Sequence, residues 1–300
     1  MAFPQTAETV IVCALMDEAR PFLKEWELAP VRDFPSYPLF QREDRFLLVT
    51  GMGKTRAAAA TSAFLQYRVH DREQTHPETF PGYDARLPSL LLLNIGIAGA
   101  RDPAQTPLGT PCPIHRIEDQ GTGECWYPDM LFRYPPLREA SLRTLDQPAL
   151  EGPEQIPEGT DLVDMEAAGI LTAARPYLQN HQVLIWKIPS DPLRKMENFR
   201  ASVTEWMHGM ARQWDSMLPE LLEKLAEPPI LTADEFQWTR KIARILQLTF
   251  SQEQQWHKAC LARRIAGRPL PQCEPPAPRH KKERQQLFYD LLQRIQSPRR

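Results

Sequence analysis

The sequence lacks a long apolar segment. Among its 300 residues, no uninterrupted hydrophobic run approaches the roughly 20 residues that a membrane-spanning helix requires. The apolar run at residues 10–15 is soon followed by Asp17 and Glu18, and no basic segment precedes it, so we expect neither a signal peptide nor a membrane partner. The five cysteines also lack CxxC spacing, which favours reduced thiols in a cytoplasmic protein over a disulfide framework.

Complete motifs for binding metal or ATP are missing as well. Cys112 and His115 have the spacing of metal ligands and Cys125 lies nearby, but no fourth ligand is evident, so we expect no metal site. Residues 51–55 (GMGKT) resemble the end of a Walker motif, yet Leu48 stands where that motif needs its first glycine. We interpret this segment either as a tight strand-to-helix turn or as a glycine turn that brings backbone close to a ligand, and we expect no organic cofactor.

Proline and charge are distributed unevenly. The 30 prolines are twice the number that an average usage of about 5% gives, and they gather at residues 77–158 and 269–278, where we expect loops. The formal net charge is only −2, but residues 231–300 contain 14 lysines and arginines against 6 aspartates and glutamates. This asymmetry indicates a separate basic extension with a partner of its own.

Apolar runs alternate with helical patterns up to about residue 225, which predicts an α/β fold. We expect strands at residues 9–14, 45–50, 89–95 and 183–188, with short strands around 113–117 and 141–145. We expect helices at residues 17–28, 54–67, 164–178 and 198–225. Only helices are expected after residue 231, at 232–248, 251–266 and 280–295.

These patterns divide the chain into two expected domains. Residues 1–229 form the α/β domain, and residues 230–300 form a basic α-helical extension with a proline-rich linker at 268–278. We expect the helices of the extension to be amphipathic and to pack on the domain or on a protein partner. The alternative is nucleic-acid binding through the cations Arg263, Arg264, Lys281, Lys282 and Arg284, because clustered cations favour phosphate backbones.

Two clusters of acidic residues are the most informative part of the sequence. Residues 162–169 (LVDMEAAG) place two acids and a methionine at the head of an alanine-rich helical pattern, and residues 187–191 (KIPSD) follow about twenty residues later. Three motifs precede them: 14–18 (ALMDE), 50–54 (TGMGK) and 94–99 (NIGIAG). In this order, the five motifs resemble the nucleoside phosphorylase/nucleosidase superfamily, and most of all its methylthioadenosine/S-adenosylhomocysteine nucleosidase and futalosine hydrolase branches.

The resemblance extends over about residues 9–226 and implies both a fold and an assembly. The implied fold is a three-layer sandwich around a mixed, mostly parallel sheet, followed here by the C-terminal helical extension. Proteins of this kind are dimers or higher oligomers, so the resemblance also implies a homo-oligomer. The implied ligand is a small nucleoside.

The resemblance further implies roles in cleaving an N-glycosidic bond. Asp191 matches the general acid that protonates a departing purine, and Ser190 would orient it. Glu166 matches the glutamate that binds the ribose hydroxyls and stabilises positive charge on the ring. Glu18 matches the glutamate that activates water. The implied substrate-binding residues are Glu166, Met165, which packs against the sugar, Ile97, Ala98, Gly99 and Lys187.

Each of these acids also has an ordinary structural explanation when it is taken alone. Glu18 and Glu166 stand where helices are expected to begin, and acids are favourable at the positive end of a helix dipole. A Ser-Asp pair after a strand, such as Ser190 and Asp191, is commonly a turn or a helix cap. The order of the five motifs favours the catalytic interpretation.

Hydrolysis is favoured over phosphorolysis. Asp17 and Glu18 stand where the phosphorylases of the superfamily carry a Gly-Asp-Pro loop, and acids there would repel phosphate. A phosphorylase remains an alternative.

Three departures from the family pattern keep a second alternative open. Ile97 replaces a common serine, and Pro189 and Pro192 flank the expected acid. The aromatic residue that stacks on the base has no clear match, and Trp126 and Tyr127 are the candidates to take its place. The second alternative is therefore a nucleoside-binding module without turnover.

Overall fold

A computed structural model describes residues 8–34, 36–75, 87, 89–130, 137–149, 152–194, 199–225, 231–271 and 274–296. The chain divides into two compact units. One unit consists of Gln5–Glu73 and Tyr83–Ala226, and the other contains Glu227–Arg300 together with Met1–Pro4 and Gln74–Gly82. Each unit is described by itself below.

The strands of the first unit belong to one sheet, which has ten strands within the described residues. Their bounds are β1 Glu8–Cys13, β2 Ala29–Pro30, β3 Leu39–Arg42, β4 Arg45–Val49, β5 Leu90–Ala100, β6 Cys112–Asp119, β7 Cys125–Trp126, β8 Ala140–Thr144, β9 Leu162–Asp164 and β10 Val183–Asp191. The longer pairings are parallel, namely β1 with β4 and β5, and β5 with β10. The mixed, mostly parallel sheet that the sequence predicts is confirmed.

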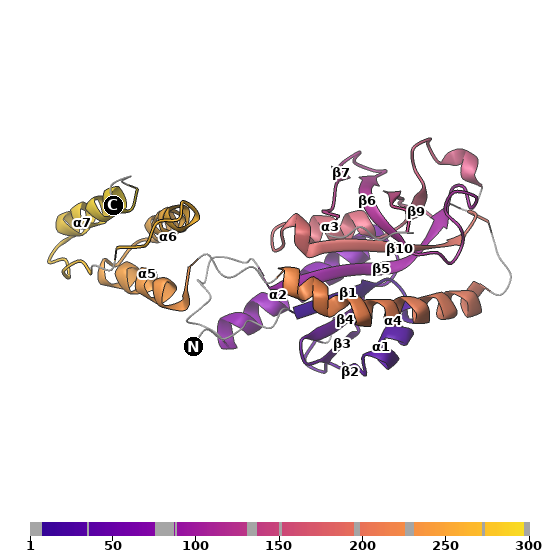
Figure 1. Cartoon of the computed structure of the whole chain (residues 1–300), viewed down its shortest axis with the longest axis horizontal. Helices are drawn as coiled ribbons and strands as arrows, with labels where there is room; N and C mark the ends of the chain where they lie inside the picture. The colour runs from indigo at the N-terminus through magenta and orange to yellow at the C-terminus, as the bar shows by residue number, and fades with distance from the viewer. Residues whose placement is uncertain are drawn as a thin grey trace. The chain divides into compact units, whose positions relative to one another are not determined.

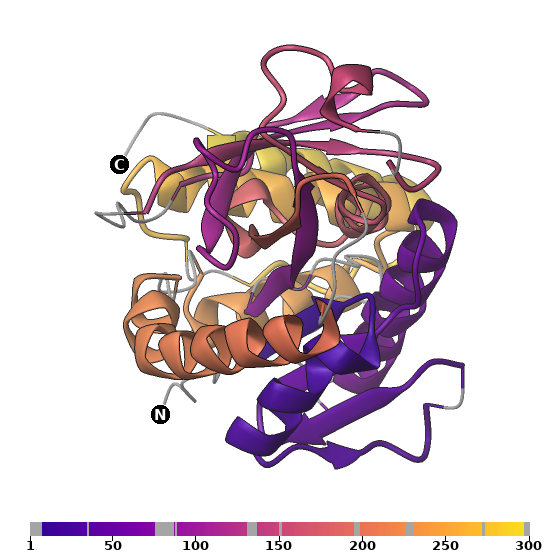
Figure 2. The same cartoon turned by 90° about the vertical axis from the view of Figure 1, so that its right-hand side faces the viewer.

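Helices cover the sheet on both faces, as the predicted three-layer sandwich requires (Figures 1 and 2). The helices of this unit are α1 Met16–Glu25, α2 Lys54–Thr75, α3 Ala167–Ala174 and α4 Phe199–Leu225. One face packs against α1 and α4, where Phe22, Trp26 and Trp214 meet alternate residues of the central strands. On the other face, Phe46 of β4 meets Phe64 of α2, with ring centroids 5.5 Å apart.

β5 changes its partner halfway along its length. Its first half pairs with β1 as far as the register Val12 opposite Asn94, whereas Gly99 and Ala100 pair with β9 instead. β10 runs along the opposite edge of β5. Because β10, β6, β8 and β9 also pair in succession, these strands and β5 form a closed ring, which the sequence did not predict.

The predicted helix at residues 164–178 is wrong at both ends. Residues 162–164 form β9, and α3 begins only at Ala167 and ends at Ala174. The backbone of Asp164 pairs with Thr144 of β8, while its Oδ2 accepts a hydrogen bond of 2.9 Å from Ala167 N. Asp164 therefore ends a strand and caps the following helix, which hydrophobic periodicity alone does not distinguish from a longer helix.

Most other predicted elements lie close to their expected places, but α2 continues eight residues beyond its predicted end, to Thr75. The short strands expected around residues 113–117 and 141–145 are β6 and β8. The strand expected at 183–188 continues to Asp191, so Ser190 and Asp191 belong to a strand and not to a turn. Within the described residues, no helix has both the length and the apolar character that crossing a membrane demands.

The second unit contains the helices α5 Ala233–Ile245, α6 Phe250–Ile265 and α7 Lys281–Gln296, in agreement with the helices predicted there. They share a core of their own, in which Trp256 is 1% exposed and lies among Ile242, Leu246 and Phe288. The predicted capping box is present at the start of α5. Glu235 N donates to Thr232 Oγ1 at 3.2 Å, and Thr232 N donates to a Glu235 carboxylate oxygen at 3.0 Å.

Gly169 and Gly209 form a matched pair of helical glycines that tests the packing of α3 on α2. A Cβ at Gly169 would lie 2.2 Å from the backbone oxygen of Lys54, whereas one at Gly209 would meet nothing within 4 Å among the described residues. We expect Gly169→Ala to lower the free energy of unfolding by about 1–3 kcal/mol through overpacking. Gly209→Ala should raise it by up to about 1 kcal/mol, because alanine is the better helix former. Urea unfolding followed by circular dichroism measures both changes, and equal effects would contradict this packing.

Candidate active site

Glu18 lies at the carboxyl end of β1, where the chain enters α1. Its side chain is buried, with the residue 2% exposed. Glu18 Oε2 accepts hydrogen bonds of 2.9 Å from Ala14 N and from Leu15 N, and Oε1 accepts one of 2.9 Å from Ile97 N. Ile97 lies beyond the point where β5 leaves β1, so the carboxylate takes the place of a strand partner. Burial raises the pKa of Glu18 in spite of these hydrogen bonds.

The close approach of Glu18 to β5 depends on Gly96. A Cβ at this position would lie 2.8 Å from Glu18 Oε1, a distance that side-chain carbons do not tolerate. Gly96 is opposite Lys187 in the register of β5 with β10. Since paired residues of adjacent strands direct their side chains to the same face, Lys187 lies on the face of the sheet that Glu18 reaches.

Glu166 lies between β9 and α3 and is 8% exposed. Its Oε1 accepts a hydrogen bond of 2.8 Å from Gly53 N, and its Oε2 accepts one of 3.3 Å from Met165 N. Gly53 has a φ of 101°, which is readily accessible only to glycine. The glycine turn thus directs a backbone amide at the Glu166 carboxylate, and its approach to a bound ligand stays a prediction.

The pKa of Glu166 is raised to about 7. Burial is the largest cause, and the negative charge of Asp164 adds to it, while Lys187 and the Gly53 amide act in the opposite direction. Glu166 is therefore partly protonated near neutral pH, in contrast to an ordinary surface glutamate.

Lys187 and Asp164 form a buried ion pair beside these glutamates. Lys187 Nζ lies 2.9 Å from Asp164 Oδ2, and the two side chains are 2% and 0% exposed. Burial opposes the charge of Lys187, but its pKa is nevertheless raised by the carboxylates of Asp164, Glu166 and Glu18. The ammonium group therefore stays charged. Burial also raises the pKa of the neighbouring Cys13 thiol well above its ordinary value, with a contribution from the charge of Glu18.

Ser190 and Asp191 end β10. Ser190 Oγ lies 2.8 Å from Asp191 Oδ2 and 3.2 Å from the carbonyl oxygen of Ala98. The other oxygen of Asp191 accepts a hydrogen bond of 2.9 Å from Leu193 N. A Cβ at Gly99 would lie 2.3 Å from the side chain of Leu193, so the glycine leaves room for this arrangement. Ser190 is buried, whereas Asp191 is half-buried.

The predicted site residues lie at the end of the sheet where the central parallel strands have their carboxyl ends. Glu18 and Glu166 both act electrostatically on Lys187. Gly99 is opposite Asp191 on one side and Val163 on the other, and Val163 leads through Asp164 into Glu166. Glu18 and Asp191 thus lie at the carboxyl ends of β1 and β10, and the carboxyl ends of strands are where ligands commonly bind in α/β sheets.

The remaining predicted residues lie around this edge. Ala98 is buried, while Met165 and Ile97 are half-buried. Tyr127, one of the two aromatic residues considered for stacking on a base, is 63% exposed, and Trp126 pairs with Ile117 in β7 and β6. Their predicted role stays a prediction.

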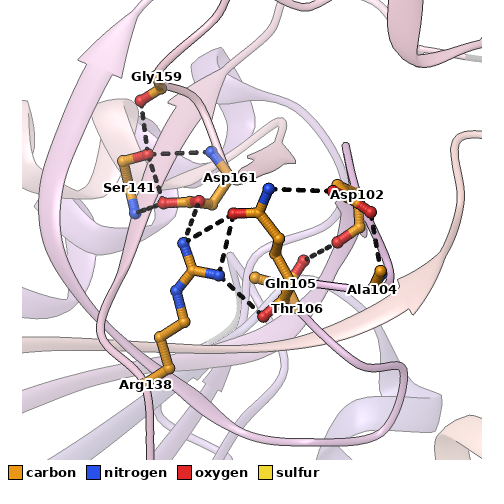
Figure 3. Close-up of polar contacts among 8 residues, drawn as sticks. All are labelled: Asp102, Ala104, Gln105, Thr106, Arg138, Ser141, Gly159 and Asp161. Atoms are coloured by element: carbon orange, nitrogen blue, oxygen red, sulfur yellow. Dashed lines mark hydrogen bonds and ion pairs between the residues drawn. The ribbon is translucent and has the colours of Figure 1, made fainter.

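A polar network holds the loop that follows β5 (Figure 3). Arg138 donates to the carbonyl oxygen of Gln105 at 2.9 Å and to Asp161 Oδ1 at 3.1 Å. Asp161 Oδ2 accepts hydrogen bonds of 2.8 Å from the backbone and hydroxyl groups of Ser141, and Gln105 is bound to Asp102. The network fixes the start of β9, which leads to Asp164 and Glu166.

Asp164 and Thr144 are site residues to which the sequence analysis assigned no role. Thr144 Oγ1 lies 2.7 Å from Asp164 Oδ1 and accepts a hydrogen bond of 3.1 Å from Ala168 N. A signal for Asp164 was present, because Lys187 stands inside an apolar strand and a buried lysine requires an acidic partner. No comparable signal pointed to Thr144. The four described cysteines, Cys13, Cys112, Cys125 and Cys260, are free thiols, and the described residues contain no cluster of three or more potential metal ligands.

Comparison with known proteins gives no match to a protein-family model or to a curated protein, but solved structures do match. The 5′-methylthioadenosine/S-adenosylhomocysteine nucleosidase of Campylobacter jejuni is 15% identical with a TM-score of 0.52, and the alignment covers 73% of this chain and 99% of that one. The 5′-methylthioadenosine nucleosidase of Arabidopsis thaliana is 15% identical with a TM-score of 0.52, covering 73% and 96%. A futalosine hydrolase mutant of Helicobacter pylori is 12% identical with a TM-score of 0.53, covering 71% and 99%.

These comparisons confirm the predicted resemblance at the level of the fold. The chain has the fold of these nucleosidase and futalosine hydrolase structures, although it is only 12–15% identical to them. A shared fold does not establish an activity, so a function has to be argued from the site.

The raised pKa of Glu166 predicts a dependence of stability on pH. The folded state keeps the Glu166 proton up to about pH 7, whereas the unfolded state releases it near its ordinary pKa of 4.5. The stabilisation from the bound proton is fully present below the unfolded-state pKa of 4.5. It is lost as the pH rises through the folded-state pKa of about 7. Glu166→Gln cannot ionise, so its free energy of unfolding relative to wild type should rise by on the order of 3 kcal/mol between about pH 5 and pH 8.

Urea unfolding at a series of pH values measures this difference. Glu154→Gln is the matched control, because the Glu154 side chain is 73% exposed and its replacement should leave the pH dependence unchanged. Parallel curves for wild type and Glu166→Gln would show that Glu166 ionises normally in the folded protein.

Proposed function

We propose that this protein hydrolyses the N-glycosidic bond of a purine-type nucleoside or thionucleoside, releasing the free base and the sugar. The observation that carries the proposal is that three acids lie at the same end of the sheet, beside the carboxyl ends of its central strands. Glu18 and Glu166 are buried with raised pKa values around Lys187, and Asp191, held by Ser190, ends the strand beside them. The fold, which is that of solved nucleosidases, supports the same activity.

Asp191 is the proposed general acid. Cleavage of the bond leaves electrons on the base, and protonation of a ring nitrogen makes the base a better leaving group. Ser190 Oγ fixes one oxygen of Asp191, and Leu193 N fixes the other. An acid held in this way can be presented to a bound base with little loss of conformational entropy, and general acid catalysis of this kind contributes roughly 10²–10⁴ in rate.

Glu166 is the proposed ligand of the ribose. Its two oxygens are bound by backbone amides of Gly53 and Met165, and each oxygen has further acceptor capacity for a sugar hydroxyl. Its negative charge would stabilise the positive charge that develops on the ring in the transition state. Met165, Ile97, Ala98 and Gly99 complete the proposed substrate contacts.

Glu18 is the proposed general base that activates water. Its raised pKa makes its carboxylate a stronger base than that of an ordinary glutamate. Water is also the better nucleophile for this site on electrostatic grounds. A phosphate dianion would have to approach the charges of Glu18 and Glu166, whereas water has no charge to be repelled.

The oligomer and the partner of the basic second unit remain predictions. The unit has a core of its own, and the residues of the proposed site belong to the first unit. Nothing in the proposed reaction requires it.

The activity is tested by incubating the protein with methylthioadenosine, S-adenosylhomocysteine, adenosine, inosine and futalosine, with and without phosphate. We expect release of free base and free sugar from at least one of these nucleosides, at a rate that does not depend on phosphate. Chromatography identifies both products. A sugar 1-phosphate formed only with phosphate would indicate a phosphorylase, and measurable binding without release of base from any of them would indicate a module without turnover.

The role of Asp191 is tested by substitution. Asp191→Asn keeps the size of the side chain but cannot donate the proton of a carboxylic acid, so kcat should fall by at least about 10²-fold. Asp215→Asn is the matched control, since Asp215 is 45% exposed and pairs with Arg45, and its kcat should equal that of wild type. Stopped or continuous assays of base release measure both. Unchanged turnover in a folded Asp191→Asn protein would remove Asp191 from this role.

A further inference from the structure

Lys187 reaches across β5 to find its partner. Lys187 belongs to β10, and Asp164 belongs to β9, and these two strands pair with opposite edges of β5. The residue of β5 opposite Lys187 is Gly96, which has no side chain to block the path. The ammonium group meets Asp164 Oδ2 at 2.9 Å in a fully buried position. The ion pair therefore links β10 to β9 across β5 at the proposed site.

Asp164 in turn holds the segment that carries Glu166. Its Oδ1 accepts a hydrogen bond from Thr144 Oγ1, and its Oδ2 accepts one from Ala167 N. Asp164 and Ala167 are the residues on either side of Met165 and Glu166, so both ends of this dipeptide are fixed by one carboxylate. A carboxylate buried in this way requires a cation, because an unpaired buried charge is highly unfavourable.

Lys187 is also the positive charge that the acids of the site share. It acts electrostatically on Glu18 from α1 and on Glu166 from the start of α3, in addition to Asp164 from β9. The charge of Lys187 also acts on the thiol of Cys13, which ends β1. Without Lys187, three carboxylates would lie together in a buried position, and they would ionise less readily.

We propose that Lys187 is a positioning residue, which acts through Asp164 to hold the Met165–Glu166 segment in place and which supplies the charge that lets Glu166 bind ligand as a carboxylate. In this proposal, Lys187 interacts with the acids of the site and does not contact the substrate directly. The part of this proposal that concerns catalysis rests on the proposed nucleoside hydrolysis. The part that concerns the state of Glu166 does not.

The experiment measures the titration of Glu166 directly. The protein is labelled with ¹³C at glutamate carboxyl groups, and the Glu166 signal is identified by its absence in Glu166→Gln. Lys187→Met removes the cation while keeping an unbranched side chain, so the Glu166 midpoint should rise from about 7 by at least about one pH unit. Asp164→Asn removes a like charge and should lower it. The double variant Lys187→Met/Asp164→Asn should lie between the two single variants.

Two further proteins complete the design. Lys241→Met is the matched control, because Lys241 is an exposed lysine that pairs with Glu274 in the second unit, and its Glu166 midpoint should equal that of wild type. Lys187→Arg keeps the charge and should return the midpoint towards wild type. If Lys187→Met does not fold, as judged by circular dichroism, the double variant still tests Lys187, because it differs from Asp164→Asn only in lacking the lysine and its Glu166 midpoint should be higher. An unchanged midpoint in folded Lys187→Met, or a double variant whose midpoint equals that of Asp164→Asn, would overturn the proposal.

Activity provides the second readout. If the wild-type protein cleaves a nucleoside, Lys187→Met should lower kcat/KM at pH 7 by at least roughly fivefold, as a shift of one pH unit in the Glu166 midpoint implies, and its pH profile should shift upward with the Glu166 midpoint. A loss of activity that is equal at all pH values would indicate a structural effect only and would contradict the proposal. If the wild-type protein cleaves no nucleoside, the proposed function fails, but the titration still tests the role of Lys187.

Discussion

The ion pair between Lys187 and Asp164 is the interaction on which the candidate site depends. A lysine and an aspartate with side chains 2% and 0% exposed are tolerated only as partners, because either charge alone would be strongly unfavourable in the interior. The pair joins strands on opposite edges of β5 and caps α3 through Ala167 N. It also supplies the positive charge beside which Glu18 and Glu166 are buried. The same ion pair therefore influences both the positions and the pKa values of these glutamates.

The backbone makes this concentration of charge sterically possible. β5 leaves β1 after Asn94 and meets β9 at Gly99, and the amide of Ile97 in between binds Glu18. Gly96 makes room for the Glu18 carboxylate, and Gly53 turns its amide towards Glu166. A side chain at Gly96 would displace the carboxylate beside it. The site is thus a consequence of a change of strand partner combined with glycines in the right places.

Local patterns in the sequence predicted the elements well but not the contacts between them. Apolar runs located β1, β4, β5 and β10, and helical periodicity located the helices of both units, because burial sets both patterns. The strand β9 was missed because it is only three residues long and ends at Asp164, whose pairing with Thr144 is non-local. The lysine inside β10 was visible as an anomaly, yet its partner is fixed by the closed ring of strands, which no local signal encodes. Motif order predicted Glu18 and Glu166 as site residues, and the structure places both beside Lys187.

The central claim is that these acids form a nucleoside site with the sugar at Glu166 and the base at Asp191. The most direct measurement is a crystal structure with a C-nucleoside, in which a carbon–carbon bond replaces the N-glycosidic bond and cleavage is prevented. The account predicts sugar hydroxyls within hydrogen-bonding distance of the Glu166 carboxylate and a ring nitrogen of the base within hydrogen-bonding distance of Asp191. A ligand bound elsewhere, or one that reverses these two contacts, would contradict it.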